Sequence, residues 1–535
     1  MMKLNFRQML RLTATIGMIA AAVSFALPPA ATASDPEQGW EGDCEDLVGS
    51  RGDVGVERAS SIVPSPTYIP ETRSFSRPVP VSVPFCRVEG TIEGNIGFEL
   101  WLPKDWNGRL LGAGVGGDAG VYNYVDMSAR LAQGFAAITT DSGHKISEAH
   151  WMLDAKKRAD YEHRAFHLST VAAKSLLARF YGREADRAYF TGCSGGGRQA
   201  LKEMQNYPGD YDGVIAGAPA PNMPMQSVRM LWFSLEQQRN PSGALSDGDW
   251  ALYESKVTQA CDGNDRVLDG IVENPAACRF DTATLACKPG QESGCIKDAP
   301  LAMLNQIVSP MVGEDGSRMD SGLFPGVRTR PGPPPPLLKS MWADGVHNDP
   351  TWDEMAFHRQ KDLALTDEVM PELRADKTAI GLFIERGNKA IIYQGWQDPS
   401  TNAGHAIDYY AKLARLHGGL DTLSKSVRLF MVPGMYHCGG GPGANRFGAS
   451  MHLPVPSDGD RSRDILWSLI HWVEDGIAPD SIIAAKDAVG DAGFTRTLCP
   501  FPKLAVYDGK GPTADASSYR CETDPTLVKL LSSGD

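Results

Sequence analysis

Apolar residues between about positions 85 and 200 come in two alternating patterns. Short apolar runs predict strands at residues 98–102, 109–112, 136–140 and 187–190. Before the last of these, apolar residues of segment 163–180 recur at roughly helical intervals, which predicts a helix, and a second helix is expected from Arg198. Strands that alternate with helices favour an α/β fold, with a mostly parallel sheet covered on both faces.

The alternation of predicted strands and helices ends after residue 222. Residues 223–376 are rich in Pro, Gly and Asp and show no clear alternation of strands and helices, so we expect an inserted lid domain there. Strands are predicted again at 390–395 and 427–432, and a helix near 464–473. The α/β domain is therefore expected to comprise residues 34–222 and 377–535, a division in keeping with a chain of 535 residues.

The first 33 residues have the layout of an export signal. A basic start precedes an apolar run at 16–27, and Ala-Thr-Ala before Ser34 is typical of a cleavage site. The apolar run is short for a bilayer span and two prolines close it, and no later segment resembles a transmembrane helix. We expect residues 1–33 to be removed, the protein to be secreted or periplasmic, and no membrane partner.

Composition narrows the function classes further. The apolar fraction of 42% and the charged fraction of 22% are ordinary for a soluble globular protein. The net charge is −13 and the chain has no basic run, which is a poor match to the electrostatics of nucleic-acid binding. A nucleic-acid partner is therefore not expected.

Ten cysteines follow the signal, and an even number in an exported chain favours disulfides. None of them forms a CxxC pair, so a structural zinc site is not expected. Three pairs are close enough in sequence for local loops: Cys261–Cys278, Cys287–Cys295 and Cys499–Cys521. Spacing leaves the pairing of the other four open; these are Cys44, Cys86, Cys193 and Cys438.

A serine nucleophile is predicted at Ser194. Residues 192–196 read Gly-Cys-Ser-Gly-Gly and fit G-x-S-x-G between a predicted strand and a predicted helix. The bare motif is common, but a nucleophile elbow requires this strand–turn–helix setting, in which glycines flank a sharp turn that exposes the hydroxyl.

A serine needs a base to take its proton, and the base needs a carboxylate to fix its tautomer. In an α/β-hydrolase the chain order is Ser, acid, His. Asp398 follows the strand predicted at 390–395, and His437 follows the strand predicted at 427–432, so these two residues are the expected acid and base.

Other histidines fit the role of base less well. His405, His417 and His471 fall in helical stretches, where a packed or solvated histidine is the simpler interpretation. His144, in Asp-Ser-Gly-His, is the strongest rival, but it precedes the serine in the chain, so a structural or pocket-lining role is favoured.

Three motifs in this order resemble the tannase/feruloyl esterase family, to which the hydrolase of mono(2-hydroxyethyl) terephthalate is also similar. They are Gly-Cys-Ser-Gly-Gly-Gly-Arg at 192–198, Gly-Trp-Gln-Asp-Pro at 395–399 and Tyr-His-Cys-Gly-Gly-Gly at 436–441. The resemblance covers nearly the whole mature chain and implies an α/β-hydrolase fold with a large inserted lid domain.

The resemblance also implies a Cys193–Cys438 disulfide, which would tether the histidine loop to the elbow, and Cys44–Cys86 then completes five bridges. An oxyanion hole needs two backbone N–H groups. Gly195, directly after the nucleophile, is the standard donor. By resemblance the second donor is Gly117, with Gly116 close behind.

Acidic residues crowd the lid segment 261–271, Cys-Asp-Gly-Asn-Asp-Arg-Val-Leu-Asp-Gly-Ile. Such a loop offers the oxygen ligands that Ca²⁺ prefers, but it does not match an EF-hand and on its own could equally be a solvated acidic turn. The resemblance implies a structural calcium site that the flanking Cys261–Cys278 bridge would brace, with these ligands: the side chains of Asp262, Asp265 and Asp269 and the carbonyls of Val267 and Ile271.

The expected function is hydrolysis of small aromatic carboxylic esters, such as feruloyl, galloyl or terephthaloyl esters, with no organic cofactor. Four lid residues are candidates for contacting the substrate ring or its substituents: Phe324, Arg328, Trp342 and Trp352. A hydrolase of another ester class on the same scaffold, such as a short-chain carboxylesterase or lactonase, is the main alternative, because lid loops set substrate choice. A non-catalytic secreted binding protein is the other.

Overall fold

A computed structural model gives the structure of residues 43–71, 77–329, 336–453, 455–486 and 493–532. The predicted export signal lies outside these residues. One sheet of ten strands organises the described chain, in the order β1-β2-β5-β6-β8-β7-β9-β10-β11-β12. Its strands are β1 Gly49–Arg51, β2 Val54–Ile62, β5 Phe85–Ile92, β6 Ile96–Pro103, β7 Arg109–Ala113, β8 Ala136–Thr140, β9 Arg187–Cys193, β10 Gly213–Gly217, β11 Lys389–Gly395 and β12 Val427–Val432.

The six strands from β8 to β12 in this order are all parallel to their neighbours. They are short and almost wholly buried, as expected for strands that have helices on both faces. The strands predicted at 109–112, 136–140, 187–190, 390–395 and 427–432 all lie here, which confirms the α/β class.

The other end of the sheet departs from the prediction of a mostly parallel sheet. Strands β1, β2, β5 and β6 pair antiparallel, and β6 pairs antiparallel with β8. The connection from β5 to β6 is only Glu93-Gly94-Asn95, with positive φ at Glu93 and Gly94. A connection this short can only reverse the chain, whereas a parallel neighbour needs a long crossover.

Helices cover both faces of the sheet. Helices α4 (Ala165–Tyr181), α5 (Gly195–Asn206) and α12 (Ala403–Leu416) pack on one face, and α2 (Tyr124–Leu131) and α14 (Ile465–Glu474) pack on the other. Each layer forms its own apolar cluster with the strand residues that point toward it. The helices predicted at 163–180, from Arg198 and near 464–473 are therefore confirmed, although α5 begins at Gly195.

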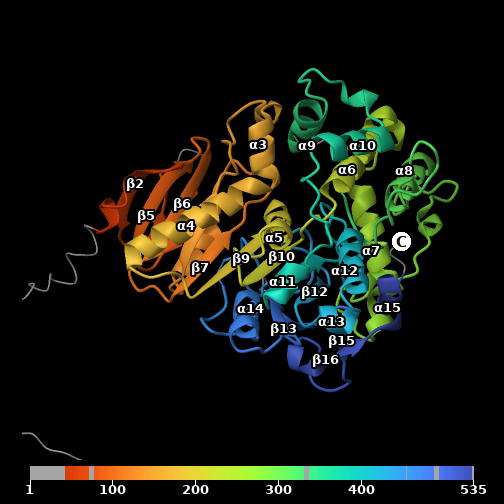
Figure 1. The fold of residues 1–535 in the computed structure, drawn as a ribbon. Coiled ribbons are helices and arrows are strands. Elements are labelled where there is room, and N and C mark those ends of the chain that lie inside the picture. Colours follow the sequence, from red (N-terminus) through yellow and green to blue (C-terminus); the bar gives the residue numbers. More distant parts are fainter. Residues whose placement is uncertain (1–42, 72–76, 330–335, 454, 487–492, 533–535) are drawn as a thin grey trace, which may run out of the picture.

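The chain between β10 and β11 forms a mainly helical region. Figure 1 shows α6, α8, α9 and α10 grouped on the side of the molecule away from β2 and β5. The helices of this region are α6 Met223–Arg239, α7 Asp247–Cys261, α8 Asp298–Val308, α9 Pro336–Ser340, α10 Arg359–Val369 and α11 Gly381–Glu385. Apolar residues of α6 and of the 338–357 segment belong to the cluster of α4, α5 and α12, so this region, which corresponds to the predicted lid and is called the lid below, packs on that face.

Smaller elements complete the described chain. Helices α3 (Ala155–Ala159) and α13 (Leu420–Leu423) are short, and α15 (Pro525–Ser532) packs on α12. Three two-stranded hairpins flank the main sheet: β3 Ser65–Tyr68 with β4 Val79–Val81, β13 Ile482–Lys486 with β14 Phe494–Leu498, and β15 Lys503–Tyr507 with β16 Tyr519–Thr523. None of the helices in the described ranges combines the length and apolarity that a bilayer crossing requires.

Candidate active site

Ser194 stands at the turn from β9 into α5. Its backbone has φ 62° and ψ −123°, a conformation that side-chain-bearing residues rarely adopt. The Ser194 N–H donates to the Gly217 carbonyl (2.9 Å), and the Ser194 carbonyl accepts from the Arg198 N–H (2.9 Å). These bonds hold the serine in the strained geometry of a nucleophile elbow.

The glycines around Ser194 are required by close backbone contacts. A Cβ added to Gly192 would lie 2.5 Å from the Gly196 carbonyl oxygen, and one added to Gly196 would lie 2.9 Å from the Gly114 carbonyl carbon. Neither position has room for a side chain, because β9, α5 and the turn after β7 meet there. The G-x-S-x-G pattern is thus a packing requirement of the turn.

Two residues from later loops complete a hydrogen-bonded chain with Ser194. The Nε2 atom of His437 lies 2.8 Å from Ser194 Oγ, and its Nδ1 atom lies 2.8 Å from Asp398 Oδ2. Asp398 follows β11 and His437 follows β12, at the carboxyl ends of neighbouring parallel strands. The fold therefore gathers the three residues that the sequence singled out.

Asp398 is held by several donors besides His437. Its Oδ1 accepts the N–H groups of Ser400 (2.7 Å) and Thr401 (2.9 Å). Its Oδ2 accepts from Thr401 Oγ1 (2.5 Å) and Gln394 Nε2 (3.0 Å). Since the carboxylate is 1% exposed, these protein donors replace water and fix its orientation toward His437.

The residues that orient Asp398 were missed by the sequence reasoning. A signal for Thr401 was present, because Asp-Pro-Ser-Thr is a pattern in which an aspartate side chain caps the amides two and three residues later. Gln394, inside β11, gave no such signal.

All five expected disulfides are present, and one of them joins the two ends of the site. Cys193 precedes Ser194 and Cys438 follows His437, and their Cα atoms are 5.9 Å apart. The bridge joins two cysteines that are 245 positions apart in the sequence and so holds the histidine loop next to the nucleophile turn. The other four are Cys44–Cys86, Cys261–Cys278, Cys287–Cys295 and Cys499–Cys521.

The glycine-rich turn Gly114–Gly117, here called the oxyanion turn, lies against Gly195. A Cβ added to Gly195 would be 3.0 Å from the Gly117 carbonyl oxygen and 3.1 Å from that of Val115. The turn is fixed by bonds from Tyr161 Oη to the Gly117 carbonyl (3.2 Å) and from the Val115 N–H to Gln199 Oε1 (2.9 Å). Within the described ranges, neither the Gly195 nor the Gly117 N–H donates to another protein group.

The rival histidines all lie elsewhere. His144 is buried and stacks on Trp151 with ring centroids 3.5 Å apart, and burial lowers its pKa to about 4. His405 is also buried, with its pKa lowered to about 4 by the same cause. His417 bonds the Thr378 carbonyl (2.8 Å), and His471 bonds Asp475, the residue that follows α14. His437 is thus the histidine that bonds Ser194.

The four lid candidates for substrate contact have different surroundings. Phe324 packs edge-on against Trp396, two residues before Asp398, with centroids 4.8 Å apart. Arg328 is ion-paired with Asp247 (3.1 Å) and lies 3.9 Å from Glu254. Glu254 in turn accepts from the hydroxyl of Tyr436 (2.6 Å), so the lid contacts the histidine loop.

The two lid tryptophans face inward. Trp342 has no exposed surface and packs against Phe357, with centroids 5.1 Å apart. Trp352 is partly buried and stacks on His347 at 4.4 Å. A fully buried ring cannot touch a substrate in this conformation, so Trp342 is a packing residue of the lid here.

The acidic lid loop is folded around its own backbone. Asp262 Oδ1 accepts the N–H groups of Gly270 and Ile271 (both 3.2 Å), and Asp265 Oδ1 accepts that of Val267 (3.0 Å). Asp269 is paired with Arg496. Asp265 also interacts with the Arg496 guanidinium, and burial raises the pKa of Asp265 to about 6.

This loop supplies hard oxygen donors, the donor type that Ca²⁺ prefers. Its excess of negative charge over positive charge also fits a cation. Across the described residues, however, no three His, Cys, Asp or Glu side chains converge closely enough to hold a metal ion. Calcium binding stays a prediction.

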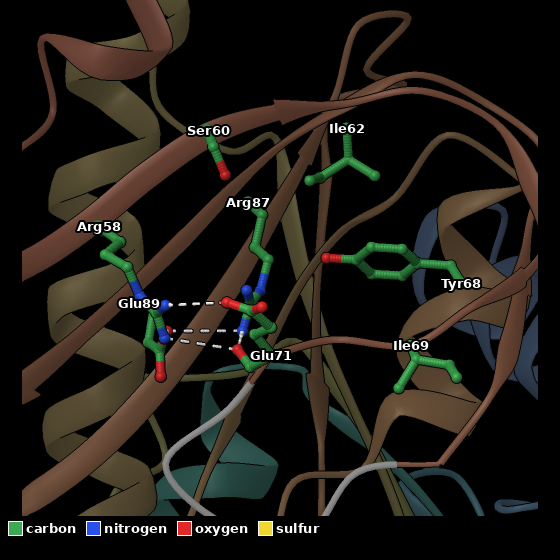
Figure 2. Close-up of a pocket in the computed structure, with 8 residues that line it drawn as sticks. All are labelled: Arg58, Ser60, Ile62, Tyr68, Ile69, Glu71, Arg87 and Glu89. Carbon is green, nitrogen blue, oxygen red and sulfur yellow. Dashed lines mark hydrogen bonds and ion pairs between the residues drawn. The ribbon is translucent and has the colours of Figure 1, made fainter.

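A second polar cluster lies in the antiparallel half of the sheet, far along the strand order from Ser194. Figure 2 shows Arg58 and Arg87 on either side of Glu89, with the ring of Tyr68 pointing toward Arg87. These residues line a hollow of about 260 Å³. Arg58 Nε donates to Glu89 (3.0 Å), and Arg87 Nη2 donates to buried Glu99 (2.6 Å). The arginines of this hollow form ion pairs with neighbouring glutamates: Arg58 with Glu71 and Glu89, and Arg87 with Glu99.

The chain matches known proteins over most of its length. A family model described as tannase and feruloyl esterase matches residues 80–522. A probable feruloyl esterase B-2 from Neosartorya fischeri is 31% identical over 459 residues, which are 82% of this chain and 87% of that protein.

Solved structures agree with this assignment. The feruloyl esterase B from Aspergillus oryzae is 26% identical, with a TM-score of 0.84, over 90% of this chain and 100% of that one. The tannin acyl hydrolase from Aspergillus niger, 19% identical with a TM-score of 0.73 over 92% and 96% of the two chains, shares the fold. The chain belongs to the tannase and feruloyl esterase family and is a carboxylic ester hydrolase.

Proposed function

We propose that this protein hydrolyses aromatic carboxylic esters through an acyl-enzyme on Ser194. The observation that carries the proposal is the continuous chain from Ser194 Oγ through both ring nitrogens of His437 to Asp398, with both distances at 2.8 Å. A hydroxyl, an imidazole and a carboxylate in this order are the components of nucleophilic acyl transfer.

In the first half of the reaction, Ser194 Oγ attacks the ester carbonyl carbon while its proton moves to His437 Nε2. Asp398 keeps Nδ1 protonated and stabilises the imidazolium that forms. His437 then gives the proton to the departing alkoxide oxygen, so the alcohol leaves neutral and the acyl group stays on Ser194. In the second half, water repeats the attack, and Ser194 recovers its proton.

The developing oxyanion needs N–H donors that are already in place. We assign this role to the amides of Gly195 and Gly117. Contact of the oxyanion turn with Gly195 and the absence of protein acceptors for both amides in the described chain support the assignment. Because Tyr161 and Gln199 fix the turn, little reorganisation is needed during the reaction.

Aromatic acids are the favoured acyl class because the family and its relatives are named for feruloyl esterase and tannase. In this chain Phe324, which is partly exposed and packs edge-on against the buried Trp396 next to the Asp398 loop, offers an aromatic contact for a feruloyl, galloyl or terephthaloyl ring on the lid side.

We further propose that the chain is exported and carries a structural calcium ion. Five disulfides favour an oxidising compartment outside the cytoplasm, and residues 1–33 would supply the export signal. The acidic lid loop would hold calcium through Asp262, Asp265 and Asp269 and the carbonyls of Val267 and Ile271. Bound there, the ion would brace the lid without taking part in the reaction.

The test is a panel of methyl ferulate, methyl gallate, mono(2-hydroxyethyl) terephthalate and p-nitrophenyl acetate, assayed with the wild type and with Ser194→Ala. We expect turnover of at least one aromatic ester at a kcat/KM above that for the acetate, and loss of all turnover in Ser194→Ala. Turnover of the acetate alone would instead assign a short-chain carboxylesterase. Turnover that survives in Ser194→Ala would contradict the mechanism.

A further inference from the structure

We infer that Tyr436 is a positioning residue for the catalytic base: its hydrogen bond to Glu254 of the lid holds His437 in line with the nucleophile. The inference rests on the proposed function and deepens it, because it makes the lid part of the machinery that holds the base. Tyr436 directly precedes His437, and its hydroxyl donates to Glu254 Oε1 at 2.6 Å. Glu254 lies on α7.

The histidine loop is fixed by its backbone only as far as Met435. The Gly434 N–H donates to Gln397 Oε1 (2.8 Å), and the Met435 carbonyl accepts from the Gln397 N–H (3.2 Å). Within the described part of the chain, neither Tyr436 nor His437 makes a backbone hydrogen bond to another backbone group. Side chains must therefore hold these two residues in place.

His437 has a side-chain restraint on each side of it in the sequence. Cys438, after it, is bonded to Cys193, and Tyr436, before it, is bonded to Glu254. If one of these neighbours were free, the backbone of His437 could turn about the other and carry the imidazole out of line. Because a general base must stay within hydrogen-bond reach of the proton that it takes, both restraints serve the reaction.

The lid end of this hydrogen bond is held on a rigid element. Helix α7 begins with a capping box and ends at Cys261, which is bonded to Cys278. Four of its side chains are buried in the apolar cluster of the lid: Trp250, Tyr253, Val257 and Cys261. Since both ends and one face of α7 are fixed, Glu254 offers an acceptor at a defined position.

The bond itself is of a strong type and is present over a wide pH range. A hydrogen bond from a phenol to a carboxylate is charge-assisted, which makes it stronger than one between neutral groups. Burial of the phenol and the neighbouring Glu254 carboxylate raise the pKa of Tyr436 to about 12. The hydroxyl therefore remains a donor throughout the pH range in which a histidine acts as a base.

A second contact joins the same part of the lid to the histidine loop. A Cβ added to Gly434 would lie 3.4 Å from Ile271 Cγ2, so the acidic loop after α7 packs against the beginning of the histidine loop. The lid thus meets this loop at Gly434 and at Tyr436, two and three residues apart from Met435 and His437 only by the chain itself. Tyr436 finds its acceptor only when the lid is docked in this way, so the base is fully positioned only then.

Kinetics of an aromatic ester with variants at the two ends of the bond test this inference. We expect Tyr436→Phe and Glu254→Ala each to lower kcat about tenfold with KM unchanged, the effect of losing one hydrogen bond that holds the base. The double variant should lose no more than either single variant, because both changes remove the same bond. Glu254→Gln keeps an acceptor for the hydroxyl and should recover most of the loss seen in Glu254→Ala.

The control is Tyr507→Phe, which removes a hydroxyl that donates to the Gly511 carbonyl (2.7 Å) on an exposed hairpin and should keep the wild-type kcat. The melting temperature of each variant shows that it is folded at the assay temperature. Wild-type kcat in Tyr436→Phe, a rise in KM alone, or equal losses in Glu254→Gln and Glu254→Ala would overturn the inference while leaving the proposed function intact. Losses that add up in the double variant would overturn it too. If the wild type hydrolyses no aromatic ester, the proposed function fails and the role of Tyr436 fails with it.

Discussion

Asp398 and Glu99 are both buried carboxylates in hydrogen-bond networks, but they stand toward opposite ends of one sheet and differ in where their networks lead. Asp398 bonds His437, whose other nitrogen bonds Ser194, a partly exposed hydroxyl beside Gly195. Glu99 accepts from Arg87, Trp101 and Tyr124, all of them buried. The first network ends on a reactive group that a substrate can reach, whereas the second is closed.

The comparison teaches that burial and hydrogen bonding of an acid do not by themselves mark an active site. The parallel strands deliver their loops to one edge, where residues from distant segments meet. The antiparallel strands around Glu99 carry their polar groups on the strands themselves, where they pair with neighbours. Changes in the open network should therefore affect rate, and changes in the closed network should affect stability.

The largest effect is expected for Asp398→Asn. The amide keeps the size of the side chain but cannot hold His437 in the required tautomer or stabilise its cation. We expect kcat to fall about 10⁴-fold, equivalent to about 5 kcal/mol of transition-state stabilisation, with a much smaller change in KM. Steady-state kinetics on the best aromatic ester measure this, and a kcat within tenfold of the wild type would contradict the assignment of Asp398.

The matching change in the closed network is Glu99→Gln. It removes the nearer of the two carboxylates that face the buried Arg87 guanidinium and leaves Glu89, 3.5 Å away, which should cost about 3 kcal/mol of unfolding free energy. Denaturant unfolding measures this loss, and kcat of the folded protein should stay near the wild-type value. Glu57→Gln, an exposed change on β2, is the control and should alter stability by less than about 0.5 kcal/mol. A large loss of kcat in Glu99→Gln with unchanged stability would erase the distinction between the two networks.

The Cys193–Cys438 bridge should matter mainly for geometry. In the double variant Cys193→Ala, Cys438→Ala, we expect kcat to fall about 100-fold when it is measured at a temperature below the melting transition. A displacement of about 1 Å between base and nucleophile lowers the rate by an amount of that order. The control is Cys287→Ala, Cys295→Ala, which opens a short loop in the lid and should leave kcat near the wild-type value. Equal kcat in both double variants would remove the positioning role.

The smallest effect is expected from chelation. EDTA should lower the melting temperature by a few degrees, because a ligand present at a free concentration of about 100 times its Kd stabilises the folded state by about 2.7 kcal/mol. The value of kcat measured below the melting transition should stay constant. Asp262→Asn should abolish the response to EDTA. A melting temperature that does not change on chelation would remove calcium from the account.

The sequence predicted the structure best where recognisable motifs directly follow buried strands. The parallel strands are continuous apolar runs, which the sequence shows clearly. The loops that follow β9, β11 and β12 supply Ser194, Asp398 and His437. The antiparallel half was missed because only 98–102 was recognised as a strand there, although the three-residue turn Glu93-Gly94-Asn95 indicates a hairpin. In the lid, Trp250, Tyr253, Val257 and Cys261 of α7 form a buried helical stripe that the Pro- and Gly-rich surroundings concealed.

Side-chain roles in the lid could not be read from residue type. An aromatic residue in a lid can pack inside or face a substrate, and only tertiary contacts separate Trp342, which is buried, from Phe324, which lies beside Trp396.

The central claim is that Ser194 is the residue that carries the acyl group. The direct test is to treat the protein with a p-nitrophenyl phosphonate, which transfers its phosphonyl group to an activated serine, and to locate the adduct by peptide mass spectrometry. The account predicts one phosphonyl group per chain, on Ser194, with loss of esterase activity in proportion to labelling and no adduct in Ser194→Ala. An inactivated protein labelled at another residue, or full activity after complete labelling of Ser194, would contradict it.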